Sequence, residues 1–344
     1  MSTNVAITVR ESSDVGAARR AAAALSRALD LDSTIAGQAA IVVTEAATNL
    51  VKHGGGGVIL LNRIGAPDSP VMEILALDKG PGMHSVERSM EDGYSTAGSP
   101  GNGLGAIARL SSFHDIYSSP GLGTVVLAHL GSPPAGPRRP APSRFQVGAV
   151  SVPKGVEPVC GDAWVTEARE HGLRVIVVDG LGHGMGAFEA SKAALEIAAA
   201  HSRDMALPLM ERIHAGLRAT RGAAVSVAEI DLELGSVTYA GLGNVAGSLI
   251  SPGGLRRQMI SYNGTAGHNA HKIRELNYPW APDTILVIHS DGLATHWTLD
   301  KYPGLHRRHP SIIAGILFRD FQRGTDDATV VVVRFAGGTQ EDRL

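Results

Sequence analysis

A proline-rich stretch near the middle of the chain, GSPPAGPRRPAPS at residues 131–143, most constrains what this sequence can fold into. It holds five prolines and two arginines but no large apolar side chain. Such a segment cannot contribute to a core, and its prolines stiffen it toward an extended spacer. Each flank carries its own alternation of predicted strands and helices, and 344 residues are enough for two cores. We therefore expect one domain over residues 1–130, a linker over 131–143 and a second domain over 144–344, rather than one domain with a long surface loop.

Composition and charge exclude several classes of protein. The formal net charge of -2 gives no general attraction to nucleic acid or to an anionic membrane. No apolar run reaches the roughly 18 residues that span a bilayer, and the beginning of the sequence lacks the pattern of a signal peptide. The single cysteine, Cys160, excludes an internal disulfide framework. We expect a cytoplasmic protein, and the sequence leaves its oligomeric state open, a homodimer included.

The first half predicts an α/β domain in which one helix carries a polar pair. Helices are expected over residues 14–30 and 34–52, and strands over 58–64, 71–77 and 124–130. In the second helix Glu45 and Asn49 are four residues apart and lie on one face. One such pair is common on solvated helices, so it is weak evidence for chemistry by itself.

Two glycine-rich segments follow this helix and strengthen the case for a nucleotide. The strand VMEILAL ends in DKGPGM, where Asp78 can accept a hydrogen bond from an exocyclic amine such as that of adenine. The glycines after it allow a ligand to approach the backbone closely. About twenty residues later SPGNGLGAIARL opens a helix whose free N–H groups suit phosphates. Three such segments in this order are a strong signal.

The segments TEAATN, DKGPG and GNGLG resemble the N, G1 and G2 boxes of the GHKL ATPase superfamily. The stretch EDGYSTAGSPGNGLGAIARL is similar to the small anti-sigma-factor serine kinases, especially the switch kinases of bacterial stress-response modules. The resemblance covers most of residues 1–130 and implies a Bergerat-type α/β sandwich that binds ATP and Mg²⁺. It places Asn49 on Mg²⁺, Asp78 on adenine and Glu45 as general base toward a partner hydroxyl. It shapes the rest of the ATP site with Gly80, Gly82, Gly101, Gly103, Leu104 and Gly105.

The second half places acidic residues at the ends of four predicted strands. They are Asp162 in VCGDAWV, Asp179 after LRVIVV, Asp291 after TILVIHS, and the pair Asp326 and Asp327 before ATVVVVRF. Any one Asp-Gly after a strand is usually only a turn. Clustered carboxylates, however, repel one another unless cations neutralise them. Oxygen ligands suit Mg²⁺ or Mn²⁺, and two such ions about 3.5–4 Å apart can activate water and clamp a phosphoryl group.

The segments GD, DGLGHG, SDG and TDDAT, in this order and spacing, resemble the bacterial PP2C-type phosphatases, in particular the sporulation and stress-response serine phosphatases. The match covers residues 144–336 and implies an αββα sandwich, so the whole chain is expected to be of the α/β (α+β) class. Two Mn²⁺ or Mg²⁺ ions are implied, with Asp162 and Asp179 as the central catalytic ligands. The implied ligand set is Asp162, Asp179, the carbonyl of Gly180, Asp291 and Asp326. The family's pattern favours Asp326 over Asp327 because its ligand comes first in the pair.

Several residues remain open from the sequence alone. His183 is interpreted as part of a structural hydrogen bond in the turn, and the alternative is a proton donor to the leaving group. Cys160 is interpreted as a small core residue. Arg144 is a candidate for contacting substrate phosphate. The glycine tract KHGGGG after residue 51 is either a flexible loop or a partner-positioning segment.

Together these patterns predict a bifunctional regulator of a partner-switching pathway that controls a sigma factor. The first domain would phosphorylate a serine or threonine on an STAS-type anti-sigma antagonist or similar phosphoprotein, since no phospho-acceptor histidine domain is visible. The second would hydrolyse such a phosphate. The main alternative is a phosphatase whose first domain is an ATP-bound module that binds an antagonist, an anti-sigma factor or a sigma factor without kinase turnover. A weaker alternative is a kinase whose second domain binds metal without catalysis.

Overall fold

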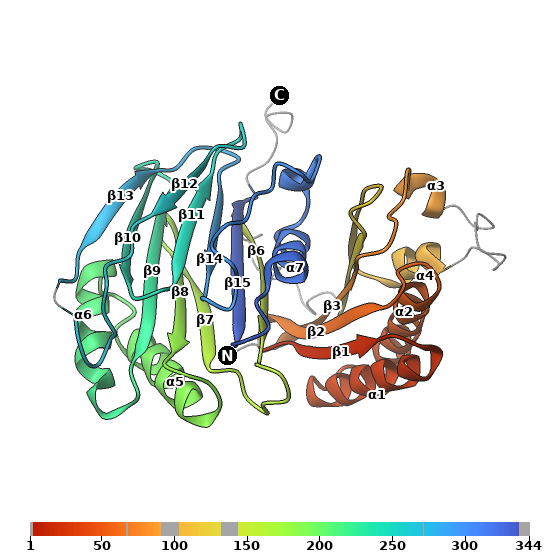
Figure 1. Ribbon diagram of the computed structural model, residues 1–344, viewed down its shortest axis with the longest axis horizontal. Helices are drawn as coiled ribbons and strands as arrows, with labels where there is room; N and C mark the ends of the chain where they lie inside the picture. The colour runs from red at the N-terminus through yellow and green to blue at the C-terminus, as the bar shows by residue number, and fades with distance from the viewer. Residues whose placement is uncertain (1–2, 67, 91–102, 132–143, 271, 337–344) are drawn as a thin grey trace. The chain divides into compact units, whose positions relative to one another are not determined.

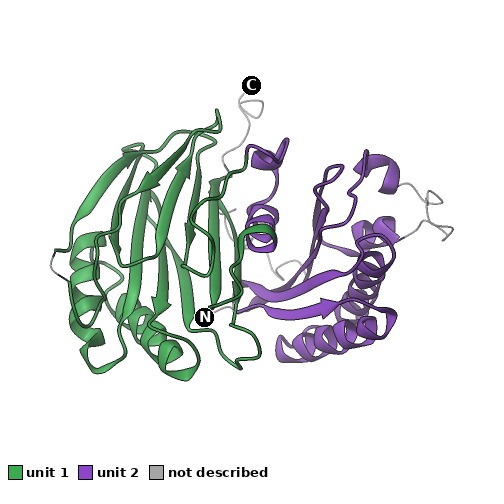
Figure 2. Ribbon diagram, viewed as in Figure 1, with its two compact units in different colours: residues 1, 142–299, 320–344 green, residues 2–141, 300–319 purple. Residues whose placement is uncertain are grey.

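The computed structural model describes residues 3–66, 68–90, 103–131, 144–270 and 272–336. Most of the predicted linker and Gly101 lie outside these ranges. The chain divides into two compact units (Figure 2). Unit 2 comprises residues 2–141 together with 300–319, and unit 1 comprises residues 142–299 and 320–344, besides residue 1. The N-terminal unit therefore includes a twenty-residue segment from far along the chain, which the boundary predicted at residues 131–143 does not foresee.

Unit 2 is an α/β sandwich with one antiparallel sheet of strand order β1-β2-β3-β5-β4 (Figure 1). Its elements are β1 (Val5–Val9), α1 (Ser12–Ala28), α2 (Ser33–Lys52), β2 (Gly57–Ala66), β3 (Ser69–Asp78), α3 (Val86–Met90), α4 (Gly103–Leu110), β4 (Phe113–Ser118) and β5 (Thr124–Leu130). The two long helices lie within about two residues of their predicted bounds. The short edge strands β1 and β4 were not predicted.

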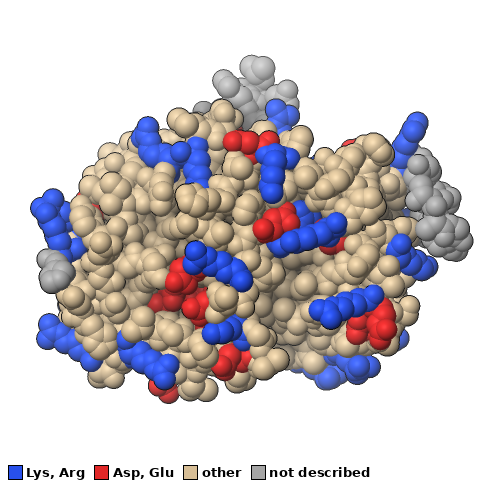
Figure 3. All heavy atoms as spheres, viewed as in Figure 1, with Lys and Arg blue, Asp and Glu red and all other residues tan. Residues whose placement is uncertain are grey.

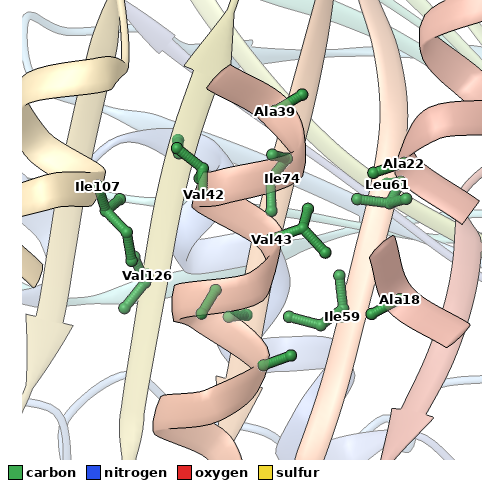
Figure 4. Packing of buried hydrophobic residues seen from close by; sticks show 14 of the residues in the cluster. Ala18, Ala22, Ala39, Val42, Val43, Ile59, Leu61, Ile74, Ile107 and Val126 are labelled. Atoms are coloured by element: carbon green, nitrogen blue, oxygen red, sulfur yellow. The ribbon is translucent and has the colours of Figure 1, made fainter. Parts of the chain in front are cut away.

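Helix α2 begins and packs as its sequence dictates. The Asp32 carboxylate accepts hydrogen bonds from the amides of Thr34 and Ile35, both 2.9 Å, and so caps the helix. Apolar residues at helical spacing then bury one face against the sheet (Figure 4). Members of this core cluster are Ala39, Val42, Val43, Ala46, Ala47 and Leu50 from α2, with Ile59, Leu61 and Ile74 from the sheet. Glu45 and Asn49 belong to the other side of the helix and stay half-buried.

The second face of this sheet is also apolar and buried. Because side chains alternate along a strand, the residues between those of the core cluster point the other way. They include Leu60, Leu75, Leu77, Val125 and Leu127, all 2% exposed or less. Helix α7 (Pro310–Phe321), which follows the short 3₁₀ helix η2 (Leu305–Arg307), packs here. A Cβ built on Gly315 would lie 2.9 Å from Leu77 Cδ2 and 3.6 Å from Val125 Cγ1.

Unit 1 contains two five-stranded antiparallel sheets, of order β13-β10-β9-β8-β7 and β12-β11-β14-β15-β6. Its strands are β6 (Phe145–Val152), β7 (Asp162–Arg169), β8 (Gly172–Gly180), β9 (Ala223–Asp231), β10 (Ser236–Leu242), β11 (Ala246–Ile250), β12 (Arg256–Met259), β13 (Glu275–Pro279), β14 (Ile285–His289) and β15 (Ala328–Phe335). Its helices are α5 (Met185–Ala200), α6 (Ala206–Gly216) and η1 (Leu217–Ala219).

The alternation of β8 builds the layers of unit 1. Val175 and Val177 point into a core shared by the two sheets, with Tyr239 on one side and Leu286 and Val331 on the other. The intervening residues form a second core with α5 and α6. That core includes Ile176, Val178, Val225, Val227, Ala194, Leu209 and Ile213. The mixed α/β class is confirmed.

No helix in the described ranges is long and apolar enough to cross a membrane. On the face drawn in Figure 3, acidic and basic side chains are interspersed over both units rather than gathered into one broad patch of a single sign. This distribution agrees with the near-neutral net charge of the sequence.

A buried arginine fixes one sheet of unit 1. Arg174 is completely buried; its Nε donates to Glu229 at 2.8 Å and its Nη1 to Glu167 at 3.0 Å. Its guanidinium also donates to the carbonyls of Ser202 and Asp204, which lie in the loop between α5 and α6. Burying a charge is strongly destabilising unless its ionic and hydrogen-bonding partners are present.

Removing this cation should destabilise unit 1. Arg174→Met leaves the Glu229 carboxylate with only Arg169, 3.7 Å away, and the Ala206 amide as partners, which should lower the free energy of unfolding by about 3–5 kcal/mol. Tryptophan fluorescence during urea unfolding reports unit 1 alone, because all three tryptophans of the chain, Trp164, Trp280 and Trp297, belong to it. As a control, Lys192→Met breaks an exposed ion pair with Glu196 and should cost less than about 1 kcal/mol. Equal losses in the two variants would contradict the assigned role.

Candidate nucleotide and metal sites

In unit 2, the predicted N box and the start of α4 lie together. Glu45 and Asn49 occupy successive turns of α2. A Cβ built on Gly103 would lie 2.9 Å from Glu45 Oε2 and 3.4 Å from Asn49 Oδ1. The absence of a side chain at Gly103 therefore keeps the space beside both polar groups open.

Asp78 ends β3 in a partly buried position. Its Oδ1 accepts hydrogen bonds from the amides of Gly80 at 2.9 Å and Thr124 at 3.1 Å. Burial raises the pKa of its carboxyl, while these two hydrogen bonds oppose the rise. Because both bonds use Oδ1, Oδ2 remains for a donor such as an exocyclic amine.

Glycines surround Asp78 because larger residues would collide with the backbone. A Cβ on Gly54 would lie 2.7 Å from Asp78 Cβ, and one on Gly80 would lie 2.8 Å from the His53 carbonyl oxygen. Gly54 also donates its amide to the Asn49 carbonyl at 3.2 Å. The glycine tract after α2 thus has a packing reason that the sequence did not reveal: it links the end of α2 to Asp78.

The remaining predicted residues of this site are placed as follows. Gly82 has a left-handed φ of 69°, and a Cβ there would lie 2.1 Å from the Ser119 carbonyl oxygen. Leu104 packs on the core cluster and Gly105 is buried, both in the first turn of α4. The partly buried Asp78, the pair Glu45 and Asn49, and the space left beside that pair by Gly103 suit an adenine nucleotide with Mg²⁺.

In unit 1, two of the predicted acids face each other across a strand pair. Asp162 begins β7 and pairs in register with Asp179 near the end of β8. Directly opposed residues of antiparallel strands have Cα atoms about 4.5–5.5 Å apart. The register of β7 and β8 therefore places these two carboxylates side by side.

The Asp179 carboxylate has an unsatisfied oxygen and a raised pKa. Its Oδ2 is buried and has no hydrogen-bond partner among the described residues. Burial, followed by repulsion from Asp162, Asp291 and Asp326, raises the pKa of its carboxyl to about 9. The same causes apply to Asp162, where burial is foremost and raises the pKa to about 7, against a hydrogen bond from Ser290 Oγ at 2.7 Å.

The pair at residues 326 and 327 divides into two roles. Asp327 is buried, and its two oxygens accept from the amides of Lys154 at 2.8 Å and Gly161 at 3.0 Å. Asp326 is half-buried, accepts the Asp327 amide at 2.9 Å and repels Asp179. Asp327 therefore holds the loops in place, and Asp326 is the member available to a cation.

Asp291 completes the acidic site. Burial and the neighbouring Asp326 raise the pKa of its carboxyl, and the Asn244 amide donates to it. Sequence reasoning missed both Asn244 and Ser290. Ser290 directly precedes the predicted acid Asp291, whereas Asn244 lies 47 positions from it, so no local signal marks Asn244. Gly180 packs tightly: a Cβ there would lie 2.1 Å from the Ala187 carbonyl oxygen.

The acidic site fits divalent cations by its chemistry. Within the described ranges, no three His, Cys, Asp or Glu side chains already converge as a ligand set. The unpaired buried oxygen of Asp179 and the raised pKa of its carboxyl nevertheless mark a site that favours a proton or a cation. Oxygen donors of this kind suit Mg²⁺ or Mn²⁺.

The residues that the sequence left open are now placed. His183 Nδ1 lies 3.0 Å from Glu157 Oε1, which is a hydrogen bond to a neighbouring loop rather than within its own turn. Cys160 is buried, burial raises the pKa of its thiol, and Ser151 Oγ lies 3.6 Å away, as suits a core residue. Arg144 lies over the Phe335 ring at 5.9 Å.

Comparison with known proteins gives each half a family. Residues 9–129 match the histidine kinase-like ATPase domain family, and residues 169–336 match the stage II sporulation protein E family. The serine/threonine-protein kinase RsbT of Bacillus subtilis is 30% identical over 115 residues, which are 33% of this chain and 86% of RsbT. The phosphoserine phosphatase RsbX of the same organism is 29% identical over 135 residues, which are 39% of this chain and 68% of RsbX.

Among solved structures, a chain from work on the bacterial stressosome as a modular system covers 56% of this chain and 100% of its own length, with a TM-score of 0.52 and 24% sequence identity. At this identity the likeness concerns the fold alone. The two family matches and the relatives RsbT and RsbX agree with the geometry of the two sites. The chain belongs to the family of anti-sigma-factor-type kinases represented by RsbT and joins to that domain, in one polypeptide, a PP2C-type phosphatase domain of the stage II sporulation protein E family.

Proposed function

We propose that this protein is a bifunctional regulator of a partner-switching pathway, in which unit 1 removes a phosphoryl group from a phosphoserine or phosphothreonine protein and unit 2 adds one from ATP. The observation that carries the proposal is the half-buried Asp179, whose buried Oδ2 is unpaired among the described residues and lies near other strand-end acids. A structural turn has no use for this costly arrangement, whereas a two-cation phosphatase requires it. RsbT and RsbX, a kinase and a phosphatase, support the pairing of activities.

For the phosphatase reaction, Asp162, Asp179, Asp291 and Asp326 would hold two Mn²⁺ or Mg²⁺ ions, with the Gly180 carbonyl as a further ligand. The bound ions would supply an activated water and neutralise the phosphoryl oxygens. Ser290 orients Asp162 through its hydrogen bond, and Asn244 orients Asp291. Asp327 accepts hydrogen bonds from the amides of Lys154 and Gly161 and so fixes the backbone around the site. These contacts prearrange the acids so that little reorganisation accompanies the reaction.

For the kinase reaction, Asp78 would select the adenine amine and Asn49 would contact Mg²⁺. Glu45, beside the open space at Gly103, would take the proton from an incoming serine or threonine hydroxyl. The proposed partner is an STAS-type anti-sigma antagonist or a similar phosphoprotein. Simultaneous action of both sites on one residue would only consume ATP, so we propose that the activities are switched against each other or directed at different partners.

The second candidate function is a phosphatase whose unit 2 binds ATP and a partner without turnover. The pairing of Glu45 with Asn49 at Gly103 favours catalysis, because a binding module needs no general base. The third candidate, a kinase whose second half binds metal without catalysis, would use the same acids around Asp179. Phosphate release from a phosphoserine protein separates it from the proposal.

Neutralising Asp179 should stabilise the metal-free protein and remove its response to metal. Its carboxyl has a folded-state pKa of about 9 against a usual value of 3.8, so stability is lost as the pH rises from about 4 toward 9. At pH 8, Asp179→Asn should therefore raise the melting temperature by about 2 °C or more. At about 100 times its Kd, Mn²⁺ should stabilise the wild type by about 2.7 kcal/mol and so raise its melting temperature. It should not raise the melting temperature of the variant.

The same variant should lose Mn²⁺-dependent phosphate release from a phosphoserine protein. Asp283→Asn, at an exposed turn with a left-handed φ of 63°, is the matched control and should keep both responses. Undiminished phosphate release by Asp179→Asn would reject the two-cation proposal.

The two neighbouring acids should separate binding from folding. Asp326→Asn should weaken Mn²⁺ binding by about tenfold or more, since one charged ligand is lost, with little change in the melting temperature. Asp327→Asn puts an amide where two backbone N–H groups need acceptors, so it should cost about 1–3 kcal/mol of stability. Calorimetric Mn²⁺ titration and thermal unfolding measure the two effects. The reverse pattern would assign the metal to Asp327.

Glu45→Gln should separate catalysis from nucleotide binding. Loss of a general base should slow partner phosphorylation by about 10²–10⁴-fold, while affinity for a fluorescent ADP analogue stays within about threefold. Glu211→Gln, an exposed change on α6, is the control. Unaltered phosphorylation would show that Glu45 is not the base, and absence of phosphorylation by the wild type would favour the binding-module candidate.

A further inference from the structure

Helix α7 belongs by sequence to one half of the protein and by packing to the other. It lies within residues 169–336, the range that matches the sporulation protein family. Yet residues 300–319 group with unit 2, as Figure 2 shows, and the helix passes into unit 1 only after Arg319. The two units therefore share one continuous helix.

Arg319 holds the corner where β3 ends. Its Nη1 donates to the Asp78 carbonyl oxygen at 2.6 Å and its Nη2 to the Leu122 carbonyl oxygen at 2.8 Å. The residue is only 7% exposed. Since burying a guanidinium is costly unless its donors are satisfied, this position is specified by its hydrogen bonds.

The corner is shaped for this guanidinium. Gly123 has a left-handed φ of 71°, and a Cβ there would lie 2.2 Å from the Asp78 carbonyl oxygen and 2.9 Å from Arg319 Nη1. The next residue, Thr124, donates its amide to the Asp78 carboxylate. Arg319 thus ties together both chain segments that orient the acid proposed to select adenine.

The beginning of α7 is fastened to the same sheet. Ser311 Oγ donates to Glu73 at 2.6 Å, and the His309 amide donates to Asp115 at 2.8 Å. Arg308 adds an ion pair to Asp115 at 3.1 Å. Because these contacts fix the helix along β3 and β4, Arg319 is delivered to Asp78 by a docked element rather than by a free loop.

Two residues after Arg319, where α7 ends at Phe321, the chain enters the loop of the acidic site. Within unit 1, the Phe321 carbonyl accepts the Ala294 amide at 2.9 Å, and the Arg323 amide donates to the Gly292 carbonyl at 2.8 Å. Gly292 follows Asp291 directly, and Asp326 comes three residues after Arg323. Four residues of chain therefore connect a contact on Asp78 with the backbone beside two of the acids.

We propose that Arg319 is a positioning residue for the nucleotide site and that α7, through it, couples nucleotide binding at Asp78 to the backbone that carries Asp291. The inference rests on the proposed nucleotide site of unit 2. A nucleotide that requires an ordered Asp78 binds more tightly when Arg319 is in place, so its binding stabilises the docked α7. If nucleotide binding changes the affinity of the acidic site for cations by some factor, then bound cations change the affinity for nucleotide by that same factor.

The first test measures ADP binding at constant Mg²⁺ to the full chain, using a fluorescent ADP analogue. Arg319→Met should weaken binding by about tenfold or more, because two hydrogen bonds from a charged donor are lost. Arg319→Lys keeps the charge but cannot span both carbonyls, so it should fall between the wild type and Arg319→Met. Arg307→Met, an exposed arginine of the same segment, should bind ADP as the wild type does. Thermal unfolding checks that each variant is folded. If Arg319→Met is not folded, the ADP affinity of Arg319→Lys decides the test.

The second test measures hydrogen exchange of peptides over residues 288–299 and 320–326, with and without ADP at the same Mg²⁺ concentration. In the wild type ADP should slow exchange at Ala294 and Arg323, whose amides make the two hydrogen bonds beside Asp291. The effect should disappear in Arg319→Met at ADP concentrations that saturate the variant. A merely structural role for Arg319 predicts no ADP-dependent change in these peptides.

The outcomes separate this inference from the proposed function. If the wild type does not bind ADP, the proposed nucleotide site fails and the inference with it. If the wild type binds ADP and both Arg319 variants bind equally well, only the positioning role is wrong. If affinity falls in the variants but ADP leaves exchange at Ala294 and Arg323 of the wild type unchanged, the coupling is wrong.

Discussion

Mutual repulsion among buried carboxylates is the constraint on which unit 1 depends. The register of β7 and β8 places Asp162 opposite Asp179, and β14 and β15 bring further acids to them. Backbone amides, Ser290 and Asn244 satisfy several of the oxygens but leave Asp179 Oδ2 unpaired. The two sheets must therefore be stable enough to hold charges that oppose one another. The apolar cores between the sheets and beneath α5 and α6 supply that stability.

The constraint on unit 2 is different, because its site depends on glycines that allow close approach of the backbone rather than on clustered charges. Gly54, Gly80 and Gly103 leave room beside Asp78, Glu45 and Asn49, and the sheet behind them is buried on both faces. The helices α1 and α2 cover one face. The other face receives α7, whose Gly315 permits close approach to Leu77. A helix that the family pattern counts with the phosphatase thereby becomes part of the structural support of the nucleotide site.

The local features of the chain were predictable from its sequence, and the long-range ones were not. Strand β5 has the predicted bounds because TVVLAHL contains a continuous apolar run of strand length. The acids of unit 1 were found because each ends or precedes an apolar strand. The grouping of residues 300–319 with unit 2 depends on pairs such as Ser311 with Glu73, which are 238 positions apart. No periodicity reports such a pair. The family's pattern favoured Asp326 over Asp327, and the two amides that occupy Asp327 support that choice.

One measurement tests the central claim, that a single chain both adds and removes a phosphoryl group. The full-length protein is incubated with limiting ATP, Mg²⁺, Mn²⁺ and an STAS-type partner, and the intact mass of the partner is followed over time. The account predicts that the mass first rises by one phosphoryl group and returns to its starting value after ATP is exhausted. A partner that gains the group and keeps it would contradict the phosphatase assignment, and one that never gains it would contradict the kinase assignment.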